Sequence, residues 1–151
     1  MSGDARERGR IVVGVDGSPS SMCALRWAAR QAELTGSEVL AVTAWRLPST
    51  YGFATAADGA ADFEGDAHKI LADALNEVSG DAPGAVIRSL VVEGHPADVL
   101  MRAARGADLL VVGSRGHGGF AGTLLGSVSR HCMHHAPCPV LVIRATGGHG
   151  L

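Results

Sequence analysis

Short apolar segments alternate with amphipathic segments along the chain. The apolar segments, rich in β-branched residues, cover residues 10–15, 38–44, 85–92, 107–112 and 139–144. Between them, residues 18–36, 63–78, 96–104 and 128–135 repeat apolar side chains every three or four positions, which is the helical period. Apolar strands that alternate with helices form parallel sheets joined by right-handed crossovers. The pattern therefore predicts an α/β fold, a doubly wound five-stranded parallel sheet with helices on both faces.

The first predicted helix carries clear local signals. Ser18 followed by Pro19 is typical of a helix start, and the pattern ends near Gly36. We expect a buried apolar stripe made of Met22, Leu25, Ala29 and Ala32. Cys23 is expected to be a small core residue of the same helix.

Three segments lack any period. Residues 1–9 are predicted to be a disordered leader, residues 10–144 one domain, and residues 145–151 a flexible, glycine-rich tail. Residues 45–60 are rich in Pro, Ser, Thr, Gly and Ala, which predicts a mobile loop. We expect this loop to order over a bound ligand as a lid.

Composition and charge argue against several classes of protein. The 151 residues suffice for one domain with a full core, and the net charge of −2 provides no basic field for nucleic acid or an anionic membrane. No apolar run approaches the ~20 residues of a membrane span, and we expect no signal peptide. Three cysteines without framework spacing fit a reducing compartment. We therefore expect a cytoplasmic protein that binds neither nucleic acid nor a membrane.

A glycine-rich loop follows the fourth predicted strand. Gly113 is followed after two residues by Gly116, and after nine more by Gly126 and Ser127. Glycines let backbone N–H groups approach an anion, and the positive end of the next helix points at the same place. Ser127 suits either a helix cap or a phosphate contact. The loop predicts a phosphate cradle without the Lys of a Walker loop, although a turn with a helix cap has the same composition.

Asp16 ends the first predicted strand and has two interpretations. At the carboxyl edge of a doubly wound sheet, a carboxylate suits a ribose hydroxyl or a metal ion bound to phosphates. Asp followed by Gly is equally typical of a turn. The sequence leaves both interpretations open.

Together these segments resemble the ATP-binding branch of the universal stress protein family. The resemblance rests on IVVGVDGSPSS from residue 11, ALRWAARQA from residue 24, EGHPADVL from residue 93, and DLLVVGSRGHGGFAGTLLGSVS from residue 108 with CPVLVIR behind it. It spans residues 10–144. The family's nucleotide signature, G-x2-G-x9-G-(S/T), is matched by Gly113, Gly116, Gly126 and Ser127.

The resemblance implies a site for ATP or another adenine nucleotide, with Mg²⁺ or Mn²⁺ bound through the phosphates. It places Gly14 and Val15 beside the nucleoside and Asp16 at the ribose or the metal-phosphate region. Ala41 and Val42 would form part of the adenine slot through their backbones, and Val112 and Gly113 would pass under the ribose. The phosphates would be wrapped by Ser114, Arg115, Gly116, His117, Gly118 and Gly119, and the cradle closed by Gly126, Ser127 and Val128. Thr123 stands where some relatives place a basic residue, which favours a shorter nucleotide.

Histidines and cysteines cluster near the carboxyl end of the chain. The set consists of His131, His134 and His135 with Cys132 and Cys138. His131 and His135 are one helical turn apart, which is ligand spacing. Cys132 and His135 also follow the core spacing of that helix, and the family pattern carries no metal there. We therefore expect no structural metal site.

The predicted function is regulatory. No Ser-His-Asp or Cys-His arrangement can be placed around the loop, and no Glu or Gln is placed to orient a water molecule. We expect a nucleotide-responsive module of the stress response with at most slow ATP hydrolysis, the stress role resting on the resemblance alone. The alternatives are a slow ATPase or nucleotidyl transferase on the same fold, and a dimeric scaffold with an empty cradle.

The last predicted strand, from Pro139 to Arg144, indicates a homodimer. It is short and apolar, and as the last strand added it is expected at the sheet edge. An unguarded edge is a template for pairing, and a two-fold axis would pair it antiparallel with its own copy. The family resemblance points the same way. The alternative is a covered edge in a monomer.

Overall fold

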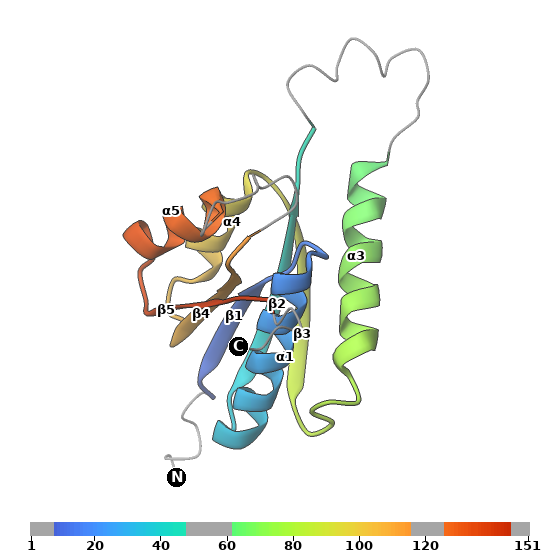
Figure 1. Ribbon diagram of the computed structural model, residues 1–151, viewed down its shortest axis with the longest axis vertical. Helices are drawn as coiled ribbons and strands as arrows, with labels where there is room; N and C mark the ends of the chain where they lie inside the picture. The colour runs from blue at the N-terminus through green and yellow to red at the C-terminus, as the bar shows by residue number, and fades with distance from the viewer. Residues whose placement is uncertain (1–7, 48–61, 116–125, 146–151) are drawn as a thin grey trace.

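The structure is a computed structural model that describes residues 8–47, 62–115 and 126–145. Strands and helices alternate as β1 (Arg10–Gly14), α1 (Pro19–Thr35), β2 (Glu38–Trp45), α3 (Phe63–Val78), β3 (Val86–Glu93), α4 (Pro96–Ala103), β4 (Leu109–Gly113), α5 (Ser127–His135) and β5 (Val140–Ile143) (Figure 1). The predicted alternation is confirmed. Each bound lies within two residues of its predicted position.

All strand pairs are parallel, and the sheet has the order β3-β2-β1-β4-β5. The chain moves outward from β1 to β3, then crosses back to β4 and β5, so the order reverses between β1 and β4. Val13 of β1 pairs with Ala41 of β2 on one side and with Val111 of β4 on the other. Open α/β sheets bind ligands beyond the carboxyl ends of the strands at such a switch point. The candidate site therefore lies where Gly14 and Gly113 end these two strands.

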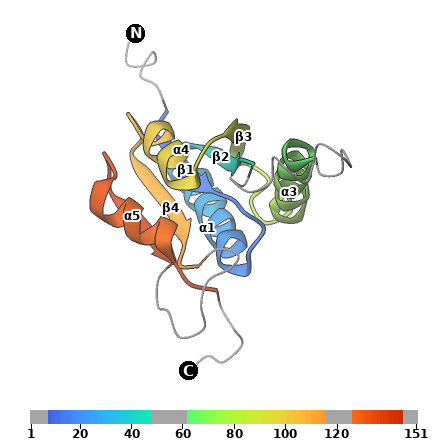
Figure 2. The ribbon, with the colours of Figure 1, turned by 90° about the horizontal axis from the view of Figure 1, so that it is seen from above.

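Helices cover both faces of the sheet (Figure 2). Alternate strand residues point to opposite faces, which divides the core into two clusters. The cluster under α1 and α3 contains Ile11, Val13, Val39, Ala41 and Val111. The cluster under α4 and α5 contains Val12, Val42, Leu110 and Val112. Among the described residues, no helix is long and apolar enough to cross a membrane.

The local signals of α1 are confirmed. The Ser18 side chain accepts a hydrogen bond from the Ser21 N–H, Pro19 begins the helix, and Gly36 ends it at a φ of 76°. The predicted stripe of Met22, Leu25, Ala29 and Ala32 is buried. The prediction for Cys23 is wrong, because its side chain is only half-buried.

Several sequence predictions fall on residues outside the described ranges. The predicted loop over residues 45–60 is described only at residues 45–47, and Trp45 is the last residue of β2. The predicted leader and tail are described only at residues 8, 9 and 145. Their mobility and the lid stay predictions.

Candidate functional site

Asp16 shapes the turn that links β1 to α1. Its Oδ1 accepts a hydrogen bond from the Ser18 N–H at 2.9 Å, and its own N–H donates to the Ser21 Oγ at 3.2 Å. Gly17 between them has a φ of 83°, a conformation that favours glycine. The turn interpretation of Asp16 is therefore confirmed. Within the described ranges Oδ2 accepts no hydrogen bond, so the ligand interpretation stays open as well.

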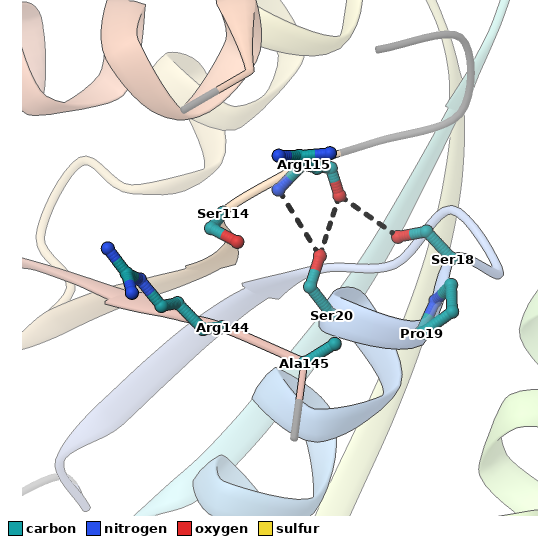
Figure 3. A pocket seen from close by; sticks show the side chains of 7 residues that line it. All are labelled: Ser18, Pro19, Ser20, Ser114, Arg115, Arg144 and Ala145. Carbon is teal, nitrogen blue, oxygen red and sulfur yellow. Dashed lines mark hydrogen bonds between the residues drawn. The ribbon is translucent and has the colours of Figure 1, made fainter. Parts of the chain in front are cut away.

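Arg115, which follows Ser114 in the signature loop, is held by hydrogen bonds from the start of α1. The Ser20 Oγ donates to the Arg115 carbonyl at 2.6 Å and accepts from the Arg115 N–H at 3.3 Å (Figure 3). The Ser18 Oγ also donates to the Arg115 carbonyl, at 3.2 Å. The first turn of α1 thus fixes the backbone direction with which the chain leaves β4.

Ser114 holds the other end of the loop. Its carbonyl accepts the Gly126 N–H at 2.6 Å and the Ser129 Oγ at 3.2 Å, and its N–H donates to the Ile143 carbonyl at 2.7 Å. The Ser129 hydroxyl lies 3.0 Å from the Gly126 carbonyl as well. The described chain on the two sides of residues 116–125 therefore meets at Ser114 and Gly126.

Gly126 caps α5, and no side chain makes a cap hydrogen bond there. Ser127 is the first residue of the helix and is exposed, so the cap interpretation of Ser127 is wrong and its other interpretation, a phosphate contact, stays a prediction. The first N–H groups of a helix have no partners within the helix. The amino end of α5 therefore presents donors and positive potential beside the loop.

Gly113 has a structural reason to be a glycine that the sequence did not indicate. A Cβ built on it would lie 2.7 Å from both the Ser20 carbonyl carbon and the Ser21 nitrogen. Gly113 is not one of the described glycines that adopt a positive φ. The missing side chain makes room for the backbone of α1. The expectation of a positive φ is wrong, and the close approach of a ligand stays a prediction.

A cavity of about 410 Å³ lies beside this junction. It is lined by Ser18, Pro19, Ser20, Ser114, Arg115, Arg144 and Ala145 (Figure 3). These residues come from the start of α1 and from the chain just after β4 and β5. Arg115 and Arg144 are exposed and bring two positive charges, and none of the described lining residues carries a carboxylate. The chemistry of the lining favours a ligand that is an anion or that carries hydroxyl groups on a ring.

The remaining predicted site residues lie deeper in the sheet. The Val15 N–H donates to the Val42 carbonyl at 2.8 Å, and Thr43 Oγ1 donates to the Val15 carbonyl at 2.8 Å. Ala41 and Val42 pair with β1 on one side and β3 on the other, so a ligand contact through their backbones stays a prediction. Val112 is buried under α4 and α5, and a Cβ on Gly14 would touch Leu100 at 3.0 Å. Gly116, His117, Gly118 and Gly119 lie outside the described residues, as does Thr123.

Comparison with known proteins decides the family. The model of the universal stress protein family matches residues 7–144. The chain belongs to the universal stress protein family.

Curated members of the family from mycobacteria are similar along nearly all of the chain. A universal stress protein of Mycobacterium tuberculosis is 37% identical over 137 residues, which cover 89% of this chain and 43% of that protein. One of Mycolicibacterium smegmatis is 35% identical over 142 residues, covering 88% of this chain and 47% of that protein. The chain therefore spans less than half the length of these relatives.

Solved universal stress proteins share the fold. One in complex with cAMP has a TM-score of 0.70 and 29% identity, covering 93% of this chain and 100% of that one. One from Archaeoglobus fulgidus in complex with dAMP has a TM-score of 0.66 and 28% identity, covering 91% and 99%. UspA from Lactobacillus plantarum has a TM-score of 0.74 at 21% identity, covering 92% and 99%, which supports the predicted fold class.

Sequence analysis of this universal stress protein domain missed part of the junction. Ser20, Ser129 and Arg144 were not named as site residues, although each borders the loop or its ends. A run of small polar residues directly after β1 was a usable signal for Ser20, because such residues gather where a strand meets a helix start. Nothing local marks Ser129 or Arg144, since their relation to the loop depends on how β5 and α5 pack.

Proposed function

We propose that this chain is an ATP-binding regulatory module, a nucleotide-responsive member of the stress response. The observation that carries the proposal is the meeting of Ser114 and Gly126 at the switch point of the sheet, beside the amino end of α5, where no side chain forms a cap hydrogen bond. Relatives at 29% and 28% identity whose structures hold cAMP and dAMP support an adenine nucleotide as the ligand class.

The residues at the junction suit a polyphosphate. The N–H groups of Ser127 and Val128, in the first turn of α5, donate to phosphate oxygens. The Arg115 guanidinium compensates part of the phosphate charge. Asp16 contributes its Oδ2, the oxygen that the turn leaves open, to a ribose hydroxyl or to a cation. A bound Mg²⁺ or Mn²⁺ ion supplies charge neutralisation at the phosphates.

We propose further that the nucleotide is held rather than turned over. The cavity lining contains hydroxyls, backbone and two guanidinium groups, but no carboxylate or imidazole among its described residues that could activate water. Turnover of purified protein well below the ~1 s⁻¹ of slow enzymes supports this role, whereas turnover at or above that rate argues for an ATPase.

The assembly proposed is a homodimer through β5 and its flanking residues Pro139 and Arg144. β5 lies at the edge of the sheet, as predicted, and within the described ranges it pairs with β4 alone. An edge with unpaired backbone groups supports pairing with a second copy across a two-fold axis.

The deciding experiment identifies what the protein carries. Small molecules are released from freshly purified protein by denaturation and identified by mass spectrometry, and the emptied protein is then titrated with ATP, ADP, AMP and cAMP in the presence of Mg²⁺. The proposal expects ATP among the released molecules and the tightest binding for ATP. Recovery of no nucleotide, together with no binding of any of the four, would favour the scaffold alternative.

A further inference from the structure

Three histidines gather on the last turns of α5. His131, His134 and His135 are all exposed. The ring centroids of His131 and His135 lie 4.6 Å apart, with the rings tilted by 42°, while those of His134 and His135 lie 6.3 Å apart. Residues four apart stack on one helix face, so the first pair owes its proximity to the helix itself.

The structure separates these histidines from the cysteines that the sequence placed near them. Cys132 is fully buried in the cluster under α4 and α5, and Cys138 packs against the same cluster. Burial raises the pKa of the Cys132 thiol to about 11, and the neighbouring Cys138 adds to the rise. Burial also raises the pKa of Cys138. The Cys132 side chain therefore belongs to the core, whereas the three histidines lie on the exposed surface of α5.

We propose that His131 and His135 form a two-imidazole chelate on the surface of α5 for a late divalent transition metal such as Ni²⁺, Cu²⁺ or Zn²⁺. Imidazole nitrogen is a preferred ligand of these ions. Among the described residues, no three His, Cys, Asp or Glu side chains form a group that could hold a metal ion. The chelate is therefore an open site of two protein ligands, completed by water, and differs from a closed structural site.

The position of the pair on α5 favours a bound cation. His134 and His135 occupy the last turn, where the final carbonyl groups of a helix carry negative potential. A metal ion that joins His131 to His135 also ties the last turn of this nine-residue helix to the turn before it. Because the two rings meet only in the helical conformation, metal binding stabilises the folded state.

The test uses Ni²⁺ alone as the probe, since it does not oxidise thiols. The whole chain is titrated at neutral pH by calorimetry, and the melting temperature is recorded with and without the ion. His131→Asn and His135→Asn should each weaken Ni²⁺ binding at least about tenfold. Removing a hydrogen-bond partner of a metal ligand already lowers metal affinity by about that factor, and removing the ligand itself lowers it at least as much. The rise in melting temperature should disappear in both variants.

Two matched controls make the result specific. His134→Asn removes a histidine from the same cluster, and His68→Asn removes an exposed histidine from α3 whose Nε2 lies 3.9 Å from the Glu64 Oε2. Both should bind Ni²⁺ about as tightly as the wild type, since a metal responds chiefly to its own ligands and their partners. An equal loss in His134→Asn would show that the ligand pair is misassigned.

Spectroscopy and unfolding supply independent readouts. Electron paramagnetic resonance of bound Cu²⁺ should show two nitrogen ligands in the wild type and one in either variant. Protein unfolded in urea should lose the tight Ni²⁺ site, because the spacing then no longer brings the rings together. Unchanged Ni²⁺ binding in His131→Asn and His135→Asn, or affinity retained on unfolding, would overturn the proposal.

Discussion

The Ser20 hydroxyl bridges the backbone of Arg115, donating to its carbonyl at 2.6 Å and accepting from its N–H at 3.3 Å. Ser20 is buried in the first turn of α1, and it lies 95 residues before Arg115 in the chain. The exit of the loop from β4 is therefore fixed by a residue of α1. Together with the Ser18 hydroxyl, this side chain couples the start of α1 to the backbone that leaves β4.

Ser20→Ala should lower both stability and nucleotide affinity. Removing the hydroxyl leaves the Arg115 N–H without this partner and costs about 1–3 kcal/mol of the free energy of unfolding. Denaturant titration measures the stability and calorimetry the binding of ATP. Ser79→Ala is the control, because that hydroxyl forms a local hydrogen bond, to the Asn76 carbonyl at the end of α3. If Ser20→Ala binds ATP as the wild type does, the bridge does not position the cradle.

Gly113→Ala should destabilise the fold even without ligand. Its new Cβ would lie 2.7 Å from backbone atoms of Ser20 and Ser21, which cannot rotate away, so we expect a loss of about 1–3 kcal/mol as in other overpacked cores. Gly80→Ala is the matched control, because a Cβ there meets no atom within 4 Å. Thermal unfolding of both variants decides the matter. A Gly113→Ala protein as stable as the wild type would contradict the close approach of α1.

Two substitutions of Asp16 separate its two roles, the hydrogen bond in the turn and the proposed contact with the ligand. Asp16→Asn keeps an oxygen that accepts the Ser18 N–H and removes the charge, while Asp16→Ala removes both. We expect Asp16→Asn to keep the stability of the wild type and to bind Mg²⁺-ATP more weakly. Asp16→Ala should lose affinity and also some stability. Equal ATP affinity in wild type and Asp16→Asn, measured by calorimetry, would leave Asp16 with the turn alone.

Glu38 should contribute a pH-dependent part of the stability. Its hydrogen bond with Arg88, at 3.0 Å, is the main cause that lowers the pKa of this carboxyl below its ordinary 4.5, and Arg10 adds to the effect. A lowered folded-state pKa means that the contribution is complete above the unfolded-state value of 4.5 and is lost as the pH falls through the folded-state value. Glu38→Gln should therefore flatten the acid limb of a stability-against-pH curve.

The control for Glu38 lies at the other end of the same strand pair. Glu93 ends β3 beside Trp45, whereas Glu38 begins β2 beside Val86. Glu93→Gln should leave the acid limb unchanged. Equal flattening by the two variants would mean that the ion pairs of Glu38 are not its source.

The dimer is best tested through the backbone of β5. All four residues of this strand pack against one of the two core clusters, so a charged side chain at Val142 would disturb the cluster under α4 and α5. The Ile143 carbonyl accepts from Ser114, and backbone groups alternate along a strand, so the N–H of Val142 points away from β4. Val142→Pro removes that outward donor and should yield a folded monomer at micromolar concentration by light scattering. A wild-type monomer, or a Val142→Pro protein that stays dimeric, would exclude this interface.

The elements were predictable because their signals are local. α1 begins at Pro19 behind a Ser18 cap and ends before Gly36, as a capping residue and a glycine of positive φ require. α3 runs from Phe63 to Val78 as its apolar period indicates. The alternation of strands and helices also predicted a parallel sheet with covered faces. Parallel strands must be joined by crossover connections, and in this chain those connections are helices that lie on the sheet.

The sequence by itself also determined where the loop lies, because Gly113, Gly116, Gly126 and Ser127 can be counted along the chain. Only the tertiary structure decided what those residues do. Gly113 is small because α1 crosses it, and Ser127 follows the cap instead of forming it. Ser20 and Arg144 join the site because β1, β4 and β5 are neighbours in a sheet whose order reverses. These contacts join residues about a hundred positions apart, and a pattern that repeats every two or four residues carries no information about them.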